Sequence, residues 1–120
     1  MAVPEIRRLD QDAEFLIPEG CHIIELSNTD SDPDVSIARA RVEPGVTTEV
    51  HWLEDTWERY VILEGNGEVE LDEGPWEKVG QSDVVLIPPG CKQRIRNSGS
   101  NELIFLAICS PRFTPDCYRS

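Results

Sequence analysis

Residues 44–65 read PGVTTEVHWLEDTWERYVILEG, and residues 82–97 read SDVVLIPPGCKQRIRN. In both stretches short runs of alternating apolar and polar residues are ended by Gly or Pro. A period of two is typical of β-strands with one buried face, and Gly and Pro are typical of the turns that join them. These two stretches predict antiparallel strands connected by tight turns.

The same pattern continues on both sides of the quoted stretches. The candidate strands are Cys21–Leu26, Val35–Val42, Thr47–Leu53, Glu58–Glu64, Gly67–Leu71, Val84–Ile87, Gln93–Arg96 and Leu103–Cys109. Helix is expected only as single turns, one near Asp10–Phe15 with Asp10 as its cap and one after Pro115. The sequence therefore predicts an all-β sandwich or barrel.

Two local patterns predict how strands are placed. The turn Glu64-Gly65-Asn66-Gly67 contains Asn-Gly, which tolerates positive φ, and it predicts a hairpin that pairs residues 60–64 with residues 68–72. The strand Leu103–Cys109 is apolar on both faces. We expect it in the middle of the core or in a subunit contact.

The composition limits the classes of function. The chain has 120 residues with 23 acidic and 11 basic side chains, which gives a formal net charge of -12. This length fits a single domain over residues 1–120, with an N-terminal arm (1–20), a core (44–97) and a C-terminal tail (110–120). The acidity argues against binding to nucleic acid and to anionic membranes. Without a signal-peptide pattern, a cytoplasmic location is the expectation, and the 4 cysteines are expected to be reduced thiols.

The two quoted stretches resemble the two sequence motifs of the cupin family, G-x5-H-x-H-x4-E-x6-G and G-x5-P-x-G-x2-H-x3-N. The positions in register are Gly45, His51, Glu58 and Gly65 in the first motif and Pro88, Gly90 and Asn97 in the second. Three positions depart: Leu53 replaces the second His, Gln93 the third His, and Ser82 the first Gly of the second motif. The resemblance implies a double-stranded β-helix, or jelly-roll, barrel.

The resemblance also implies a metal ion inside the barrel. The candidate ligands are His51, Glu58 and Gln93, with Glu49 as a further carboxylate on the same strand face as His51. One imidazole with oxygen donors shifts the preference toward Mn, Fe(II), Mg or Ca and leaves Zn and Ni open. The alternative is a metal-free barrel, in which Leu53 fills the cavity and the polar side chains hydrogen-bond to one another. Glu49 would then be an exposed residue near the barrel mouth.

Four further residues are candidates for contact with a substrate. Tyr60 shares a strand face with Glu58 and could act as an acid or base, or could simply fill the core. Trp57 could stack on a substrate at the cavity mouth or plug the rim. Arg39 and Arg41 share one face of their strand and would anchor an anion if that face looked inward. Because buried arginines are rare without partners, we expect that face to look outward.

These observations lead to a functional hypothesis. The resemblance leads us to expect a small cupin with one divalent ion (Mn, Fe, Ni or Zn) as its cofactor. It would act on a small polar metabolite such as a sugar or a hydroxy or keto acid, as an isomerase, a lyase or a dioxygenase. The alternative is a metal-free cupin that binds a small ligand without turnover. The resemblance further implies a homodimer.

Overall fold

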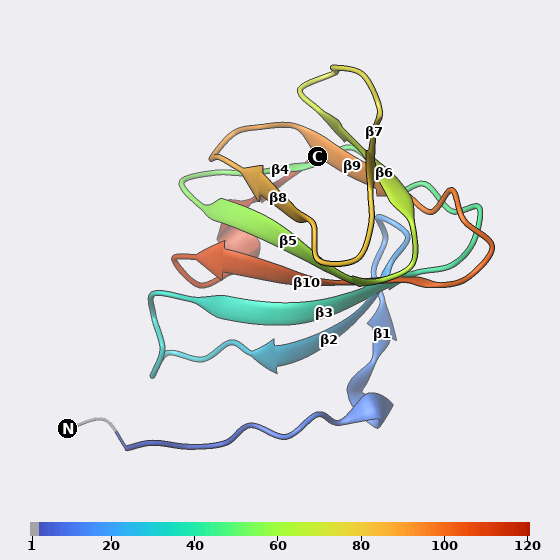
Figure 1. The fold of residues 1–120 in the computed structure, drawn as a ribbon. Helices are drawn as coiled ribbons and strands as arrows, with labels where there is room; N and C mark the ends of the chain where they lie inside the picture. The colour runs from blue at the N-terminus through green and yellow to red at the C-terminus, as the bar shows by residue number, and fades with distance from the viewer. Residues whose placement is uncertain (1–2) are drawn as a thin grey trace.

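Two layers of antiparallel strands pack face to face in the structure, a computed structural model that describes residues 3–120 (Figure 1). The larger sheet has the order β1 (Phe15–Leu16), β2 (His22–Ser27), β3 (Ser36–Val42), β10 (Leu103–Ser110), β5 (Trp57–Glu64) and β8 (Val84–Ile87). The opposite layer contains a sheet of β7 (Glu77–Val79), β6 (Gly67–Leu71) and β9 (Gln93–Arg96), and a ribbon of β4 (Trp52–Leu53) and β11 (Tyr118–Arg119). The all-β prediction is confirmed.

Within residues 3–120, helical structure is limited to two 3₁₀ turns, η1 (Gln11–Ala13) and η2 (Pro115–Cys117). Asp10 caps η1, because its carboxylate accepts a hydrogen bond from the Asp12 amide at 3.0 Å. Both turns lie where the sequence predicted them. Among residues 3–120 no helix has the length and hydropathy needed to cross a membrane.

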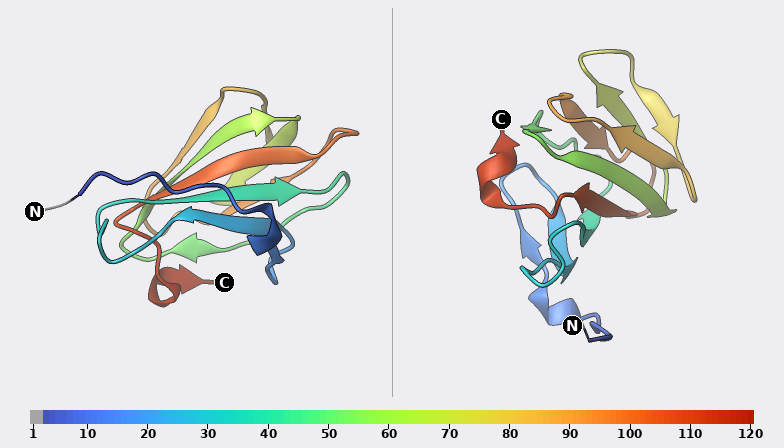
Figure 2. Two further views of the ribbon diagram at one scale, coloured as in Figure 1. Left: turned by 90° about the horizontal axis from the view of Figure 1, so that it is seen from below. Right: turned by 90° about the vertical axis from the view of Figure 1, so that its left-hand side faces the viewer.

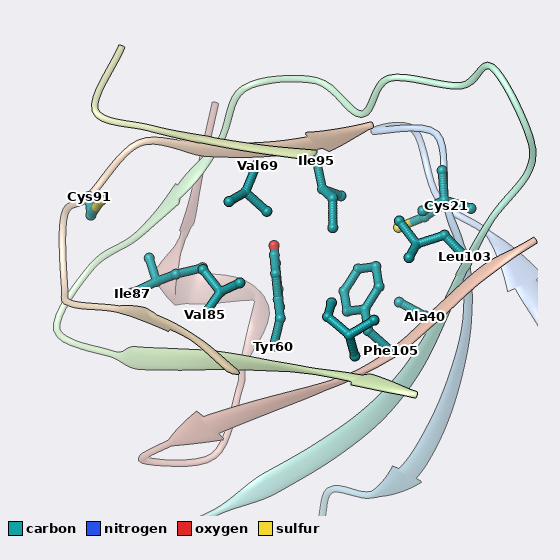
Figure 3. Close-up of a cluster of buried hydrophobic side chains, with 12 residues drawn as sticks. Cys21, Ala40, Tyr60, Val69, Val85, Ile87, Cys91, Ile95, Leu103 and Phe105 are labelled. Carbon is teal, nitrogen blue, oxygen red and sulfur yellow. The ribbon is translucent and has the colours of Figure 1, made fainter. Parts of the chain in front are cut away.

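The core lies between the two layers and is built by strand alternation. Tyr60 on β5 points toward the layer that carries Val69 and Ile95, and Ile87 on β8 and Phe105 on β10 belong to the same buried cluster (Figure 3). The central strand of the larger sheet is β10, which pairs with both β3 and β5. Its two apolar faces are explained by this position, as the sequence predicted.

The predicted hairpin at Gly65 is wrong in its pairing. β5 pairs with β10 and β8, whereas β6 pairs with β7 and β9, so the chain leaves one sheet at Gly65 and enters the other. Gly65 has φ of +87°, and a Cβ atom there would lie 2.4 Å from the carbonyl oxygen of Glu102. A residue without a side chain is therefore needed at the point where the chain changes layers.

The predicted strand over residues 47–53 is interrupted. Only Trp52–Leu53 forms a strand, and the preceding residues touch β9 through isolated bridges. The cause is Thr48, whose hydroxyl accepts a hydrogen bond from the Ile95 amide at 3.0 Å, a place that a backbone carbonyl would take in a regular ladder. His51 nevertheless lies opposite Gln93, and their backbones exchange hydrogen bonds of 3.1 and 2.8 Å.

Candidate functional site

A cavity of about 470 Å³ opens into the barrel between the larger sheet and the segment that carries His51. Its inner end contains polar groups of Glu58, Tyr60 and His51, and its walls include small and aromatic residues of β3 and β10. This volume lies within the range of small-molecule sites, which is about 300–1,000 Å³. The cavity is therefore the first place to look for a bound ligand.

Gln93 connects two residues that line this cavity, Glu58 and Tyr60. Its side chain is 1% exposed, and its amide nitrogen donates to the Glu58 carboxylate at 2.8 Å. Its amide oxygen accepts a short hydrogen bond from the Tyr60 hydroxyl. Figure 3 shows the Tyr60 ring pointing from β5 across the barrel interior. The three residues form a buried network in which the amide fixes a carboxyl group on one side and a phenol on the other.

Burial controls the protonation of this network. It raises the pKa of Glu58, while the nearby His51 and the hydrogen bond from Gln93 act in the opposite direction. The pKa of Tyr60 is raised well above its ordinary value by burial and by the Glu58 charge, so the phenol stays protonated. The Cys109 thiol lies 3.8 Å from the second Glu58 oxygen. Burial raises the pKa of that thiol too, which makes it a poor nucleophile.

A second polar group lies at the side of the cavity and centres on Glu19. Its carboxylate lies 3.2 Å from Nδ1 of His51 and accepts a hydrogen bond from the Tyr118 hydroxyl at 3.1 Å. The Tyr118 ring also stacks on the His51 ring with centroids 5.4 Å apart. Tyr118 belongs to β11, which lies beside β4 and pairs with it (Figure 2). Tyr118 is one of the residues that line the cavity.

These contacts determine how the His51 ring is protonated. Nδ1 lies near two acceptors, the Glu19 carboxylate and the Glu49 carbonyl oxygen, each at 3.2 Å, so Nδ1 carries the hydrogen. Nε2 makes no hydrogen bond within residues 3–120, where every fully buried side-chain nitrogen and oxygen has a partner. Nε2 is therefore the ring nitrogen left open toward the cavity, and in the tautomer with its hydrogen on Nδ1 it is an acceptor.

The predicted metal ligands are only partly free to bind an ion. His51 keeps Nε2, and Glu58 keeps an oxygen that only the Cys109 thiol contacts. Gln93 has its amide oxygen occupied by Tyr60, and Glu49 lies exposed on the cavity rim. Two free donors are fewer than the three protein ligands that catalytic zinc sites use. Within the described residues no group of three His, Cys, Asp or Glu side chains is arranged to hold a metal ion. The divalent ion stays a prediction.

The predicted substrate residues separate into two groups. Tyr60 lines the cavity. Arg39 and Arg41 lie on the outer face of β3, while Ala38 and Ala40 line the cavity on the inner face, as expected from the rarity of buried arginines. Trp57 is 42% exposed on the outer face of β5. Arg39, Arg41 and Trp57 are not among the residues that line the cavity, so the structure does not bring them together with Tyr60.

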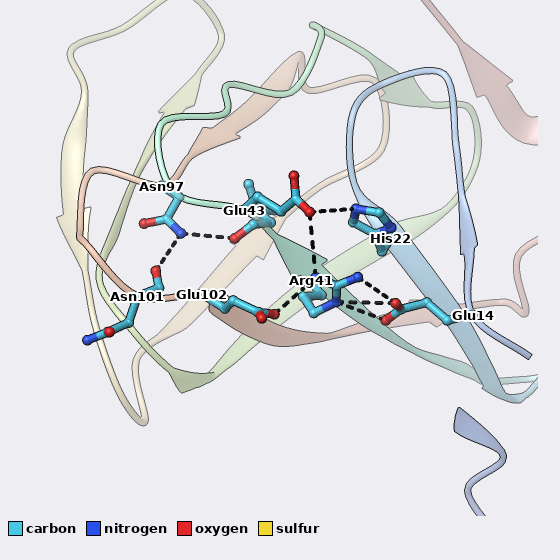
Figure 4. A network of polar contacts seen from close by, with 8 residues as sticks. Glu14, His22, Arg41, Glu43, Asn97, Asn101 and Glu102 are labelled. Carbon is cyan, nitrogen blue, oxygen red and sulfur yellow. Dashed lines mark hydrogen bonds and ion pairs between the residues drawn. The ribbon is translucent and has the colours of Figure 1, made fainter. Parts of the chain in front are cut away.

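Arg41 has a structural role in place of an anchor (Figure 4). Its guanidinium group lies 2.6 Å from Glu14 and 3.1 Å from Glu102, which ties the N-terminal segment to the start of β10. Figure 4 also shows Asn97 of the second motif nearby. Its amide donates to the carbonyl oxygens of Val42 and Asn101 at 2.9 and 2.8 Å, so it fixes a turn.

Sequence reasoning missed Glu19 and Tyr118. Both lie outside the two motifs, in the predicted N-terminal arm and C-terminal tail, and no strand pattern places them. The available signal was chemical: a tail that is rich in Pro but also apolar has to pack on something. It packs on β4, beside His51.

Comparison with known proteins identifies the family. The family model described as "Cupin domain" matches residues 38–109, which is more than half of the chain. The uncharacterized protein MJ1618 of Methanocaldococcus jannaschii is 32% identical over 107 residues, covering 88% of this chain and 85% of its own.

Two solved structures have the same fold. An uncharacterized conserved protein with a double-stranded β-helix domain from Klebsiella pneumoniae has a TM-score of 0.79 at 16% identity, covering 96% of each chain. KdgF from Halomonas sp. has a TM-score of 0.78 at 18% identity, covering 91% of this chain and 96% of its own. The jelly-roll prediction is thereby confirmed, and the chain belongs to the cupin family.

Proposed function

We propose that this cupin binds one small organic molecule in the barrel cavity and that Glu58 exchanges a proton with it. The observation that supports the proposal is the placement of Glu58: it is 8% exposed, lines the cavity and is held by the Gln93 amide. A carboxyl group whose pKa is raised by burial keeps its proton to a higher pH than a free carboxyl group does and can donate it to a bound molecule.

Tyr60 supports Glu58 in this scheme. Its hydroxyl fixes the orientation of the Gln93 amide, which in turn donates to Glu58. The amide nitrogen cannot point elsewhere while its oxygen accepts from the phenol. Tyr60 thus acts as a positioning residue, and Glu58 is the proposed catalytic residue.

The proposal is tested by retention of small molecules. The protein is incubated with a deproteinised metabolite extract, washed by ultrafiltration, and its retained compounds are identified by mass spectrometry. We expect the wild type to retain a compound that Ala107→Phe loses, because Ala107 lines the cavity and the larger ring fills it.

A matched pair of variants tests the role of the carboxyl group. Glu58→Gln should bind the retained compound and leave it chemically unchanged, while Glu64→Gln, on the exposed end of the same strand, should behave as the wild type. Equal retention by the wild type and Ala107→Phe would contradict binding in the cavity. Full turnover by Glu58→Gln would contradict the assigned proton exchange.

A bound divalent ion is a second candidate, and one observation favours it. The Glu19 carboxylate on Nδ1 directs Nε2 of His51 into the cavity, and a carboxylate on the second nitrogen is the usual support of a metal-bound histidine. His51 and Glu58 would hold the ion, which would supply Lewis-acid polarisation of a substrate oxygen. Elemental mass spectrometry of protein purified without chelators tests this. An ion present in the wild type and lost in His51→Ala supports it, and equal metal content in both contradicts it.

A further inference from the structure

The acidic groups of the cavity lining outnumber the basic ones, although burial raises the pKa of Glu58 and of Glu25 and so reduces their share of the negative charge. Four carboxyl groups line it, from Glu19, Glu25, Glu49 and Glu58, and no Lys or Arg is found among the described lining residues. The nearest arginines on β3 point to the opposite face of the sheet, where Arg41 is paired with Glu14 and Glu102. A concave site lined by one sign of charge concentrates ligands of the other sign. The lining therefore opposes an anion and attracts a cation.

The walls of the cavity are apolar and partly aromatic. The lining includes the aromatic rings of Phe105, Phe113 and Tyr118, and the small side chains of Ala38 and Ala107 take up little of the space. Aromatic faces attract organic cations, and the effect is larger where water is excluded. A bare metal ion would gain nothing from such walls, whereas a ligand with a hydrocarbon part would.

His51 supplies an independent indication of the ligand. Its side chain is 5% exposed, and because no fully buried side-chain nitrogen of residues 3–120 lacks a partner, Nε2, which makes no hydrogen bond there, is open to the cavity. With the hydrogen on Nδ1, such an open acceptor can take a hydrogen bond from a donor on the ligand. An ammonium group has N–H donors and positive charge together, so it can satisfy Nε2 of His51 and a carboxylate of the lining at the same time.

We propose that the cavity binds a small organic amine in its protonated form, with the ammonium group between the lining carboxylates and His51 and the hydrocarbon part against the aromatic walls. This inference rests on the proposed function, because it specifies the ligand class of that same cavity. The inference specifies a positively charged ligand, whereas the proposed function requires no particular ligand charge. It also departs from the sugar or keto acid expected from the sequence.

Isothermal titration calorimetry with matched probes tests which sign of ligand charge the cavity prefers. Benzylamine, benzyl alcohol and benzoate share a ring and differ in charge, and butylamine, butanol and butyrate repeat the comparison on a flexible frame. We expect each amine to bind about tenfold more tightly than its alcohol, since one hydrogen-bonded ion pair contributes roughly that factor. The carboxylates should bind most weakly.

Two variants localise the effect. Glu19→Gln removes one lining charge and should weaken the amines by about tenfold while the alcohols are unaffected. Glu64→Gln, outside the cavity, should leave the affinities of both the amines and the alcohols unchanged. Chemical shifts of the backbone amides confirm that the Glu19 variant is folded and show whether probes perturb the residues of the cavity.

The outcomes separate the two proposals. Alcohols or carboxylates that bind as tightly as the amines would overturn the amine inference and leave a small-molecule site in place. Absence of binding for all six probes at millimolar concentration would count against both. Tighter binding of the amines that persists in Glu19→Gln, with shifts outside the cavity, would also overturn the inference.

Discussion

Replacing Gln93 by Leu would test the buried network of Glu58, Tyr60 and Gln93 most directly. The two side chains have similar volume, but Leu cannot hydrogen-bond. The Glu58 carboxylate would lose the hydrogen bond that it accepts from the Gln93 amide nitrogen at 2.8 Å. The Tyr60 hydroxyl would lose the Gln93 amide oxygen as its acceptor. An unsatisfied buried group costs about 1–3 kcal/mol, so the free energy of unfolding should fall by about 2–5 kcal/mol.

The assay is urea denaturation followed by tryptophan fluorescence at fixed pH. Tyr60→Phe alone leaves the Gln93 oxygen without its donor and should cost about 1–2 kcal/mol. The double variant Gln93→Leu with Tyr60→Phe should then be more stable than the sum of the two losses predicts, because the phenol that Gln93→Leu strands is absent.

The cost of Gln93→Leu should also depend on pH. Gln93 donates to the Glu58 carboxylate and so lowers the Glu58 pKa against the effect of burial. Its removal therefore penalises the ionised form more than the protonated form, and the loss of stability should be greater at pH 8 than at pH 4.5. Wild-type stability in Gln93→Leu, or strict additivity with Tyr60→Phe, would refute the described network.

Three further predictions concern other parts of the chain. Burial raises the folded-state pKa of Glu58 above 4.5, so the free energy of unfolding should fall as pH rises from 4.5 through the folded-state pKa. Glu58→Gln should flatten this decline, and a pH profile of the unfolding free energy that equals the wild-type profile would contradict it. Gly65→Ala should lower the melting temperature, because its Cβ would meet the Glu102 carbonyl oxygen at 2.4 Å, and an unchanged value in calorimetry would contradict the described crossing. Val84 and Leu86 are 61% and 55% exposed on the outer face of edge strand β8, so the expected homodimer should bury them; Leu86→Lys should then sediment as a monomer, and a monomeric wild type would contradict the dimer.

The sequence predicted individual strands better than their partners. Alternation along the chain reports which side of a strand is buried, and it placed Tyr60 inside and Arg41 outside. This alternation does not report which other strand pairs with a given strand. Asn-Gly after β5 therefore suggested a hairpin, while the true constraint at Gly65 is the close approach of residue 102, which only the assembled fold reveals.

The same limit applies to the site. His51, Glu58 and Gln93 could be found from motif positions because local strand geometry aims them inward. The hydrogen bonds and protonation of these side chains could not be predicted, because they depend on partners that lie far away in the sequence. Glu19 and Tyr118 are 99 positions apart, yet both contact His51. The Glu19 carboxylate favours a hydrogen on Nδ1 of the ring.

The smallness of β11 has a consequence for access to the cavity. This strand has two residues, Tyr118 and Arg119, and it is attached to the equally short β4. Elements with few buried contacts open locally at a small fraction of the global unfolding energy. We therefore expect the wall that Tyr118 contributes to open while the two sheets stay intact, so that a molecule bound in the cavity would exchange through local opening of β11.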